Sequence, residues 1–572
     1  QQITGQQTIF GHPKGLFVCF FSEMWERFGF YLMLGIFSLY MMDSVEGGGM
    51  GFDKQKKSDL YGTYIGLVYL TPFIGGLLAD RLLGYRKSIF IGGLLMALGY
   101  FGLSFQGETI FYLSLLCVII GNGFFKPNIS TLVGNLYNNE KFKANKDAGY
   151  NIFYMGINIG AFICNFVAAY MRINYGWGWA FAAAGVGMLI GLVIFLVGTN
   201  HIKDVDVIKP TQPGDLSVVK ILSYVFIPVF IFGILGWMIP SNIFGTDAND
   251  AFLFGCIPIL LFYGSLWYRA NHDEKNQIGA LLSVFLCVII FWAVFHQNGD
   301  ALTVWAEEYT DREMPAGVDK AAQSLNLATL VNYDSSVNLS EEEFHAMKEN
   351  MLMQKNLFSQ AGNVMAADSV SKLLSAKEKS YHYFQNIPEG KRPEQGQSLK
   401  LYSTELYQSI NPFWVIFLTP VLVGFFGWLR SRKKEPSTPA KIALGLFITG
   451  LSTLVMVAAA GLTDIHFEKT SSLWLIASYG VITVGELCLS PMGLSLVSKL
   501  SPPRITSLMM GGWFLSTSVG NKLAGILSGT WEGFENKSHF FLMNFGLCMI
   551  ATLLLVLLLK WLRTVMREKG IN

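Results

Sequence analysis

Long apolar runs recur along the whole chain, separated by short polar segments. Each run has about 20 residues, enough for an α-helix to cross a hydrocarbon core of roughly 30 Å. Because lipid offers no hydrogen-bond partner to a backbone amide, we predict that every run is helical. The spans lie near residues 15–42, 59–79, 88–106, 111–136, 150–171, 178–199, 217–239, 251–269, 279–300, 412–429, 440–462, 473–498, 506–528 and 540–562. This pattern predicts an all-α membrane protein with about 14 transmembrane helices.

The polar segments predict how these spans are grouped. The linker from His201 to Asp215 precedes two spans without buried charges, which we interpret as a hairpin inserted between two six-helix bundles. In a later hydrophilic stretch, Ser340 and Glu343 have the spacing of a capping box, which predicts short helices. The composition of that stretch fits a small folded lid and a loosely ordered loop equally well. The predicted division is 1–200 for the N-terminal bundle, 201–272 for the linker and hairpin, 273–300 for the seventh core helix, 301–411 for an extracytoplasmic insertion, and 412–572 for the remaining C-terminal helices and a cytoplasmic tail.

Composition agrees with a bilayer protein. Hydrophobic residues make up 52% of the chain and charged residues only 14%, whereas a soluble domain has about 25% charged residues. The net charge of +2 indicates no polyanionic partner such as nucleic acid. All seven cysteines fall in apolar spans without a CxxC pair, so neither a disulfide framework nor a zinc site is predicted. We expect no metal and no cofactor.

Basic residues in short loops predict the orientation, because cytoplasmic loops carry an excess of lysine and arginine. One alternate set of loops, with the C-terminal tail, holds 21 of them. The opposite short loops hold six, namely Lys54, Lys56, Lys57, Arg172, Lys469 and Lys537. We therefore expect a multi-pass protein of the plasma (inner) membrane with both termini in the cytoplasm and the 301–411 insertion outside. Within it, residues 307–405 are expected to be replaceable by a short flexible linker without abolishing the activity.

The first span carries three charges, and a charge at the centre of a span costs about 2.5–3.5 kcal/mol on insertion scales. Glu23, Glu26 and Arg27 are spaced i, i+3 and i+4, so they share one helical face, which Tyr31 extends by a turn. A structural ion pair between two helices would need only two of these groups. The pattern therefore favours a functional site in the bundle interior.

Two further buried charges complete the expected site. Lys126 in the fourth span could neutralise one of the glutamates, and protonation of that acid would then release the amine for an anionic ligand. Glu486 is the lone buried acid of the second half, and Pro491 predicts a helix break beside it. Cations on the first half facing an acid on the second half would complement a zwitterionic substrate.

Aromatic and amide side chains at matching depths could line the cavity between these charges. Each aromatic residue alone is more often a packing residue. Asn158 and Asn411 could bond a peptide backbone, and Ser490 lies one turn beyond Glu486. The aromatic candidates are Phe30, Tyr31, Tyr69, Tyr154, Trp292 and Trp513.

These residues sit in motifs that resemble those of the proton-dependent oligopeptide transporter family within the major facilitator superfamily. Glu23-Met-Trp-Glu26-Arg27-Phe28 resembles the family signature of the first helix. Similar motifs are Gly75-Gly76-Leu-Leu-Ala-Asp80-Arg81, Phe153-Tyr154-Met-Gly-Ile-Asn158-Ile-Gly160 and Gly485-Glu486-Leu-Cys-Leu-Ser490-Pro491. The resemblance covers nearly the whole chain apart from the insertion, which is not a usual family feature.

The resemblance implies the major facilitator fold and proton-coupled symport of di- and tripeptides by alternating access, through a protein that functions as a monomer. It also implies that Arg27 and Lys126 hold the peptide carboxylate, that Glu486 holds the amino group, and that Glu23 and Glu26 take part in proton coupling. The lining residues would be Tyr31, Tyr69, Asn158, Trp292, Asn411 and Trp513.

The seventh core helix departs from the family pattern. One turn after Trp292, where the family usually has an acid, the chain has His296. Asp300 follows four residues later on the same face and could substitute. A protonated histidine is cationic and would be repelled by nearby cations. We therefore expect Asp300, or the Glu23–Glu26 pair, to carry the coupling proton, with His296 as a secondary contact.

Other function classes fit less well. A related symporter for another small solute, such as nitrate or a peptide-like compound, remains the alternative, although nitrate would leave Glu486 without a cation to bind. A primary pump is disfavoured because the only Gly-Lys pair, Gly390-Lys391, lacks the rest of a phosphate-binding loop. The sequence offers no nucleophile–base pair or metal cluster, so we do not expect an enzyme.

Overall fold

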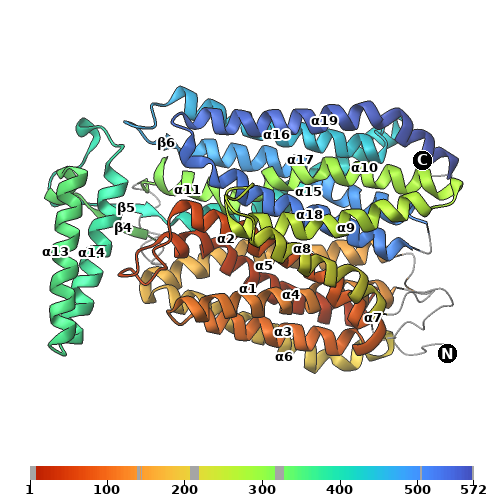
Figure 1. The fold of residues 1–572 in the computed structure, drawn as a ribbon, viewed down its shortest axis with the longest axis horizontal. Coiled ribbons are helices and arrows are strands. Elements are labelled where there is room, and N and C mark those ends of the chain that lie inside the picture. The colour runs from red at the N-terminus through yellow and green to blue at the C-terminus, as the bar shows by residue number, and fades with distance from the viewer. Residues whose placement is uncertain are drawn as a thin grey trace.

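The computed structural model describes residues 8–137, 142, 145–206, 218–315, 328–502 and 505–569. Long helices lie side by side along one axis, and one helical pair, α13 and α14, is set across an end of this bundle (Figure 1). We call that end the insertion end. Both chain ends lie at the opposite end, which we call the tail end.

The N-terminal half contains six long helices, preceded by a small hairpin of two short strands. The hairpin is β1 (Thr8–Ile9) and β2 (His12–Pro13). The helices are α1 (Lys14–Met42), α2 (Lys54–Leu78), which continues as the π-helical turn Ala79–Leu83, α3 (Tyr85–Leu103), α4 (Glu108–Leu136), α5 (Lys146–Tyr175) and α6 (Trp177–Val197). Two short 3-10 turns, Gly198–His201 and Lys203–Val205, follow; the rest of the predicted linker lies outside the described residues.

An inserted pair of helical segments and the C-terminal half follow. The pair consists of α7 (Val218–Ile221) and α8 (Ile227–Trp237), joined by the turn Leu222–Phe226, and α9 (Asp247–Arg269). The C-terminal half has α10 (His272–Phe295), the 3-10 turn His296–Gly299, α11 (Ala301–Glu308), α15 (Ile410–Ser431), α16 (Thr438–Leu462), α17 (Ser472–Leu500), α18 (Thr506–Gly529) and α19 (Lys537–Glu568). Strands β3 (Thr310–Asp311) and β6 (Thr470–Ser471) pair in parallel at the insertion end.

Length and apolar composition identify nine membrane-spanning candidates among the described helical segments. They are Glu108–Leu136, Gly149–Tyr175, Trp177–His201, Asp247–Arg269, Glu274–Glu308, Thr404–Ser431, Thr438–Leu462, Ser472–Leu500 and Lys537–Glu568. Helix α1 is long enough to span but contains Glu23, Glu26 and Arg27. Helix α1 is not among the nine because these charges lower its mean hydropathy, and the same charges make it a candidate for the functional site.

The insertion forms a folded unit at the insertion end. It contains β4 (Ala328–Asn332), the turn Ser335–Asn338, α13 (Glu341–Gln360), α14 (Val364–Phe384), the turn Glu389–Lys391 and β5 (Ser398–Tyr402), with β4 and β5 antiparallel. The predicted capping box of Ser340 and Glu343 is confirmed at the start of α13. The helical segment before the insertion continues through residue 300 to Glu308.

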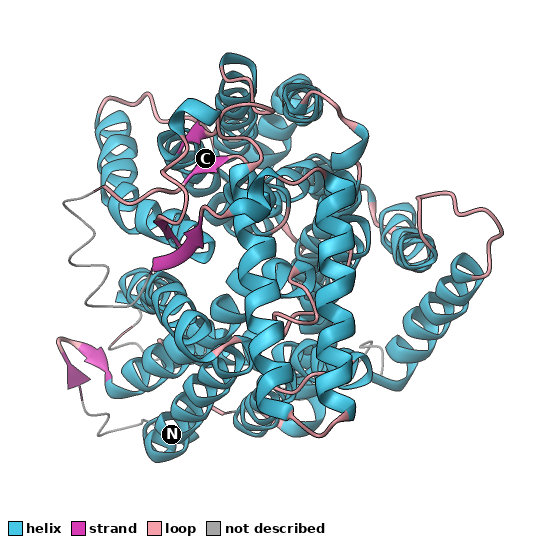
Figure 2. Ribbon diagram, turned by 90° about the vertical axis from the view of Figure 1, so that its left-hand side faces the viewer, coloured by secondary structure: helices cyan, strands magenta, loops and turns pink. Residues whose placement is uncertain are grey.

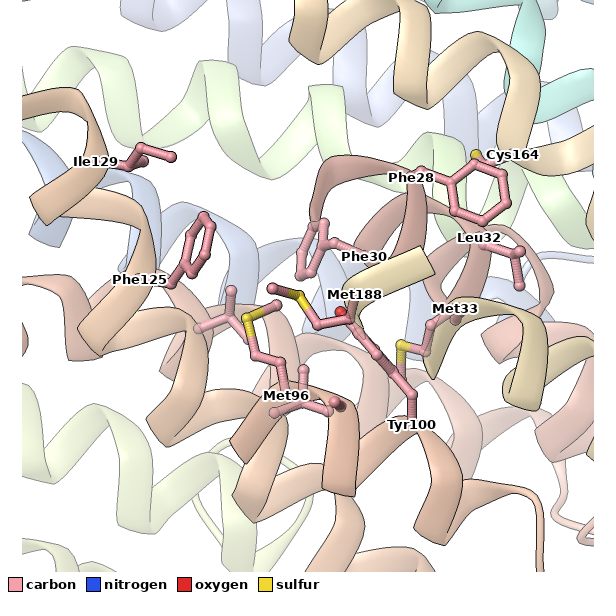
Figure 3. Close-up of a cluster of buried hydrophobic side chains, with 14 of the residues drawn as sticks. Phe28, Phe30, Leu32, Met33, Met96, Tyr100, Phe125, Ile129, Cys164 and Met188 are labelled. Atoms are coloured by element: carbon pink, nitrogen blue, oxygen red, sulfur yellow. The ribbon is translucent and has the colours of Figure 1, made fainter. Parts of the chain in front are cut away.

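Each half has its own apolar core, which fixes the interior faces of its helices. In the N-terminal half, Phe30 of α1 lies toward Met96 of α3 and Phe125 of α4, whereas Phe28 lies beside Cys164 of α5 (Figure 3). A separate buried cluster joins α10, α16, α17, α18 and α19. Because the halves are packed independently, the surface between them is free to carry polar groups.

Candidate functional site

The charged face of α1 forms one buried ionic cluster. The Arg27 guanidinium pairs with both carboxylates: its Nε lies 3.5 Å from Glu23 and also contacts Glu26, to which Nη2 donates at 2.6 Å. All three residues are at most 1% exposed. One Glu23 carboxylate oxygen, Oε2, has no hydrogen-bond partner among the described residues. The cluster therefore has two carboxylates and one cation, so a proton or a second cation would balance its charge.

Asn122 of α4 supports this cluster and was missed from the sequence. Its Oδ1 accepts a hydrogen bond from Arg27 Nη2 at 3.0 Å, and its Nδ2 donates to the Val68 carbonyl of α2 at 3.0 Å. Asn122 lies one turn before Lys126 on the same helix face, and that spacing is the signal which could have identified it.

Lys126 does not pair directly with a glutamate, as its predicted neutralising role would require. Within the described chain it forms no ion pair, and its ammonium lies over the Tyr69 ring, 4.3 Å from the centroid. Both α1 carboxylates are paired with Arg27 instead. Lys126 is partly exposed, so its charge is available to an anionic ligand.

Glu486 of α17 is held in place by its own half. Its Oε2 accepts a hydrogen bond from Asn411 Nδ2 of α15 at 3.0 Å, and the same amide donates to Thr483 Oγ1 at 2.9 Å. Glu486 and Asn411 are both partly exposed. Helix α17 continues through Pro491, and the kink that Pro491 predicts stays a prediction. A missing amide is tolerated where neighbouring helices support the backbone.

Aromatic side chains bring the two halves together near these charges. Tyr31, Tyr69 and Tyr154 of the N-terminal half all lie within electrostatic range of Glu486. These tyrosines are partly exposed or exposed, unlike the core around them. The structure thus brings the cationic N-terminal side and the acid of the C-terminal side to one accessible region.

The seventh core helix contributes a second aromatic contact. His296 stacks on Trp292, with ring centroids 5.3 Å apart, and lies edge-on to Tyr69 at 5.8 Å. Tyr69 is therefore placed between His296 and Lys126. The nitrogens Trp292 Nε1 and His296 Nδ1 are buried without a hydrogen-bond partner among the described residues.

Three predicted lining residues, Phe30, Trp513 and Asn158, are poorly placed to contact a ligand, because two are buried in the cores and the third bonds its own helix. Phe30 and Trp513 are 1% and 2% exposed and belong to the cores of the two halves, and Trp513 packs edge-on against Phe285 at 6.1 Å. Asn158 donates its side-chain amide to the Tyr154 carbonyl of its own helix at 3.0 Å. Ser490 is partly exposed, one turn beyond Glu486.

Asp300 pairs with Lys57 of the other half and not with His296. It forms a buried ion pair with Lys57 of α2, and Ser58 Oγ donates to the same carboxylate at 3.2 Å. Lys57 was interpreted from the sequence as a loop residue, which is wrong: it lies in α2 and is 1% exposed. A lysine in the first turn of a helix looks solvent-exposed until the facing helix supplies an acid.

A second ion pair of α2 has the opposite polarity. Asp59 accepts from Lys522 Nζ of α18 at 2.7 Å, and Thr63 Oγ1 lies 2.5 Å from the same nitrogen. Lys57 and Asp59 thus connect α2 to two different helices of the other half, α10–α11 and α18.

The remaining polar contacts between the halves lie on the same side of the molecule. Arg172 of α5 pairs with Glu405 at 2.6 Å, Asn165 donates to Ser409 Oγ at 3.0 Å, and Ser38 donates to the Gly299 carbonyl at 2.6 Å. Between residues that the structure describes, hydrogen bonds and ion pairs across the halves all lie between the insertion end and the middle of the bundle. These contacts fasten the halves together at the insertion end.

The arrangement suits the binding of a ligand with charges of both signs. It offers cations on one side and a carboxylate on the other, with tyrosines between them. In the described part of the chain, no group of three or more histidine, cysteine, aspartate or glutamate side chains could hold a metal ion. Asp80 and Arg81, from the loop motif, have side chains outside the described part.

Comparison with known proteins agrees with this geometry. The di-/tripeptide transporter of Lactococcus lactis subsp. lactis (strain IL1403) is 27% identical over 566 residues, covering 97% of each chain. A solved structure of a mutant of a peptide transporter POT in complex with sulfate aligns with a TM-score of 0.74 at 28% identity, over 98% of this chain and 97% of that one. A POT family transporter in complex with 5-aminolevulinic acid aligns with a TM-score of 0.73 at 25% identity, over 98% of both chains. Because the POT family model also matches residues 86–327 and 399–545, more than half of the sequence, the chain belongs to this family of membrane transporters.

Proposed function

We propose that the protein takes up di- and tripeptides together with protons, by alternating access between its two halves. The observation that carries this proposal is the division of charge: Arg27 and Lys126 belong to one half and Glu486 to the other. A short peptide has a carboxylate and an ammonium at opposite ends, so it can bridge the halves only in one orientation. The relatives named as peptide transporters support the same substrate class.

Proton coupling is assigned to the α1 cluster. With both Glu23 and Glu26 ionised, Arg27 is fully engaged. Protonation of one acid removes a competing anion, so the guanidinium can accept the peptide carboxylate. Asn122 keeps the guanidinium oriented during this exchange. Glu486, held by Asn411, then receives the ammonium. Another ligand with a carboxylate at one end and an ammonium at the other, such as an amino acid with a longer backbone, could bind the same residues.

The proposed topology has 14 spans, both chain ends in the cytoplasm and the insertion end outside. Lys57 no longer counts among the external loop residues, because it is buried, and its removal strengthens the charge asymmetry. The conformation is then closed to the outside. A single chain supplies both sides of the site, which supports a functional monomer.

Uptake by proteoliposomes tests this function. The purified protein should accumulate labelled dialanine when the outside is acidic, and collapse of the gradient with a protonophore should reduce uptake to equilibration. Unlabelled di- and tripeptides should compete, whereas nitrate and single amino acids should not. Absence of gradient-driven accumulation, or competition by nitrate with none by dipeptides, would overturn the proposal.

A further inference from the structure

The insertion crosses the insertion end from one half of the bundle to the other. Figure 2 views the molecule from this end, where α13 and α14 lie in front of the bundle helices. We call residues 328–402 the strap. The matched stretches of the POT family model end at residue 327 and resume at 399, so residues 328–398 of the strap are not part of the family pattern.

The base of the strap is fastened to the C-terminal half. Asn386 Nδ2 donates to the backbone carbonyls of Glu308 at 3.0 Å and Ile465 at 3.2 Å. Lys391 pairs with Glu468 at 3.1 Å. Both attachment points flank helices of the same half, so the strap moves with that half.

The helices of the strap are fastened to the N-terminal half. Lys379 of α14 lies 3.3 Å from the Asp43 carboxylate, and Lys355 of α13 lies 3.7 Å from Glu46. A Cβ added at Gly47 would lie 2.9 Å from Ser375 Oγ of α14. These partners belong to the loop of residues 43–51 between α1 and α2, which we call the seat. Asp43 also accepts from Trp177 Nε1 at 2.8 Å, so the seat is tied to α6.

Contacts within the strap join its elements into one unit. Phe344 and Tyr381 stack with centroids 3.8 Å apart, and Lys348 pairs with Glu378 at 2.5 Å, which joins α13 to α14. Lys377 pairs with Asp334 at 2.7 Å. Burial alone would raise the pKa of Asp334, but the Lys377 ammonium and Ser336 outweigh it and hold that pKa below its ordinary value of 3.8.

We infer that the strap is a latch that joins the two halves across the outside and stabilises the outward-closed conformation over the outward-open one. The inference rests on the proposed alternating access. The seat belongs to the N-terminal half, and the base of the strap is fixed to the C-terminal half. Separation of the halves at the insertion end would therefore move the seat away from the strap. Both ion pairs would break in that step. They are partly exposed, so each contributes a bias of about two- to fivefold.

A reversible cross-link tests the latch. In Gly47→Cys/Ser375→Cys, oxidation should join the seat to α14. We expect uptake of labelled dialanine to stop on oxidation and to return on reduction, while dialanine binding from the tail end persists. The two single variants, oxidised in the same way, control for crowding at Gly47 and for the natural cysteines. Uptake at the wild-type rate by the fully cross-linked double variant would overturn the proposal.

Removal of the two ion pairs tests the energetic bias without a cross-link. Lys355→Gln/Lys379→Gln should increase the outward-open fraction about four- to 25-fold, measured as the distance between spin labels at the exposed positions Gln106 and Glu535 of opposite halves. Lys372→Gln is the matched control, because Lys372 pairs with Asp368 on its own helix. An unchanged distribution would overturn the latch. This readout needs no substrate, so failure of dialanine uptake in every form would refute the proposed function and leave the latch testable.

Discussion

Replacement of Asp300 with asparagine should hold the insertion end open. In the closed conformation Lys57 is 1% exposed and Asp300 is fully buried, so the variant leaves an uncompensated ammonium in the bundle. Loss of one partner of a buried ion pair costs about 3–5 kcal/mol. When the halves separate, Lys57 reaches water and the cost disappears. At about 1.4 kcal/mol per tenfold, the equilibrium moves by about a hundredfold to several thousandfold toward the open form.

The assay combines a distance with transport. Spin labels at Gln106 and Glu535 should report a longer separation in Asp300→Asn than in the wild type. Both proton-driven uptake and counterflow of dialanine should be lost, because each needs the end to close. Asp464→Asn controls for the loss of an exposed carboxylate at the same end.

The double variant Asp300→Asn/Lys57→Met separates the charge from the packing. It removes the buried ammonium, so closure should return to within about 1–2 kcal/mol of the wild type, since an apolar replacement of a buried pair is often neutral. The reasoning is refuted if Asp300→Asn is as closed as the wild type, or if the second substitution restores nothing.

Three other predictions concern the site and the strap. Glu486→Gln should weaken dialanine binding by about 2–5 kcal/mol, because the peptide ammonium loses its charged partner, whereas the exposed Glu535→Gln should bind normally; equal affinities would remove Glu486 from the site. Asn122→Leu should raise the dialanine dissociation constant about ten- to 150-fold through loss of a hydrogen bond to a charged group, and an unaltered constant would show that Arg27 needs no support. The low pKa of Asp334 means that its stabilisation is complete above about pH 4 and is lost as pH falls through the folded-state value. The hydrogen-exchange protection of the strap, corrected for the intrinsic exchange rate, should therefore fall in acid for the wild type and depend less on pH for Asp334→Asn.

The sequence could predict local geometry well because helical spacing determines it. The shared face of Glu23, Glu26 and Arg27 follows from i, i+3 and i+4 positions, and the ion pairs of Arg27 confirm it. The helix start at Ser340 follows from the capping box in the same way.

Partners across the two halves could not be predicted, because spacing along the chain says nothing of which helix faces which. Lys57 looked like a loop lysine until α10–α11 supplied Asp300. Trp292 and Trp513 both belong to the core of the C-terminal half, yet Trp292 stacks on His296, whereas Trp513 packs edge-on against Phe285. The order of the strap also depends on contacts with the seat, which composition does not encode.

The opposite charges at positions 57 and 59 of α2 have a consequence for the accuracy of closure. Residues two apart on a helix point about 200° away from each other, so the two side chains address different helices. Rotation or sliding of α2 that exchanged their directions would set Lys57 against Lys522 and Asp59 against Asp300, like charge against like. Only one register of the two halves then satisfies both pairs. The two ion pairs that hold the insertion end closed therefore also select the correct alignment of the halves, because a misaligned closure would place like charges against each other.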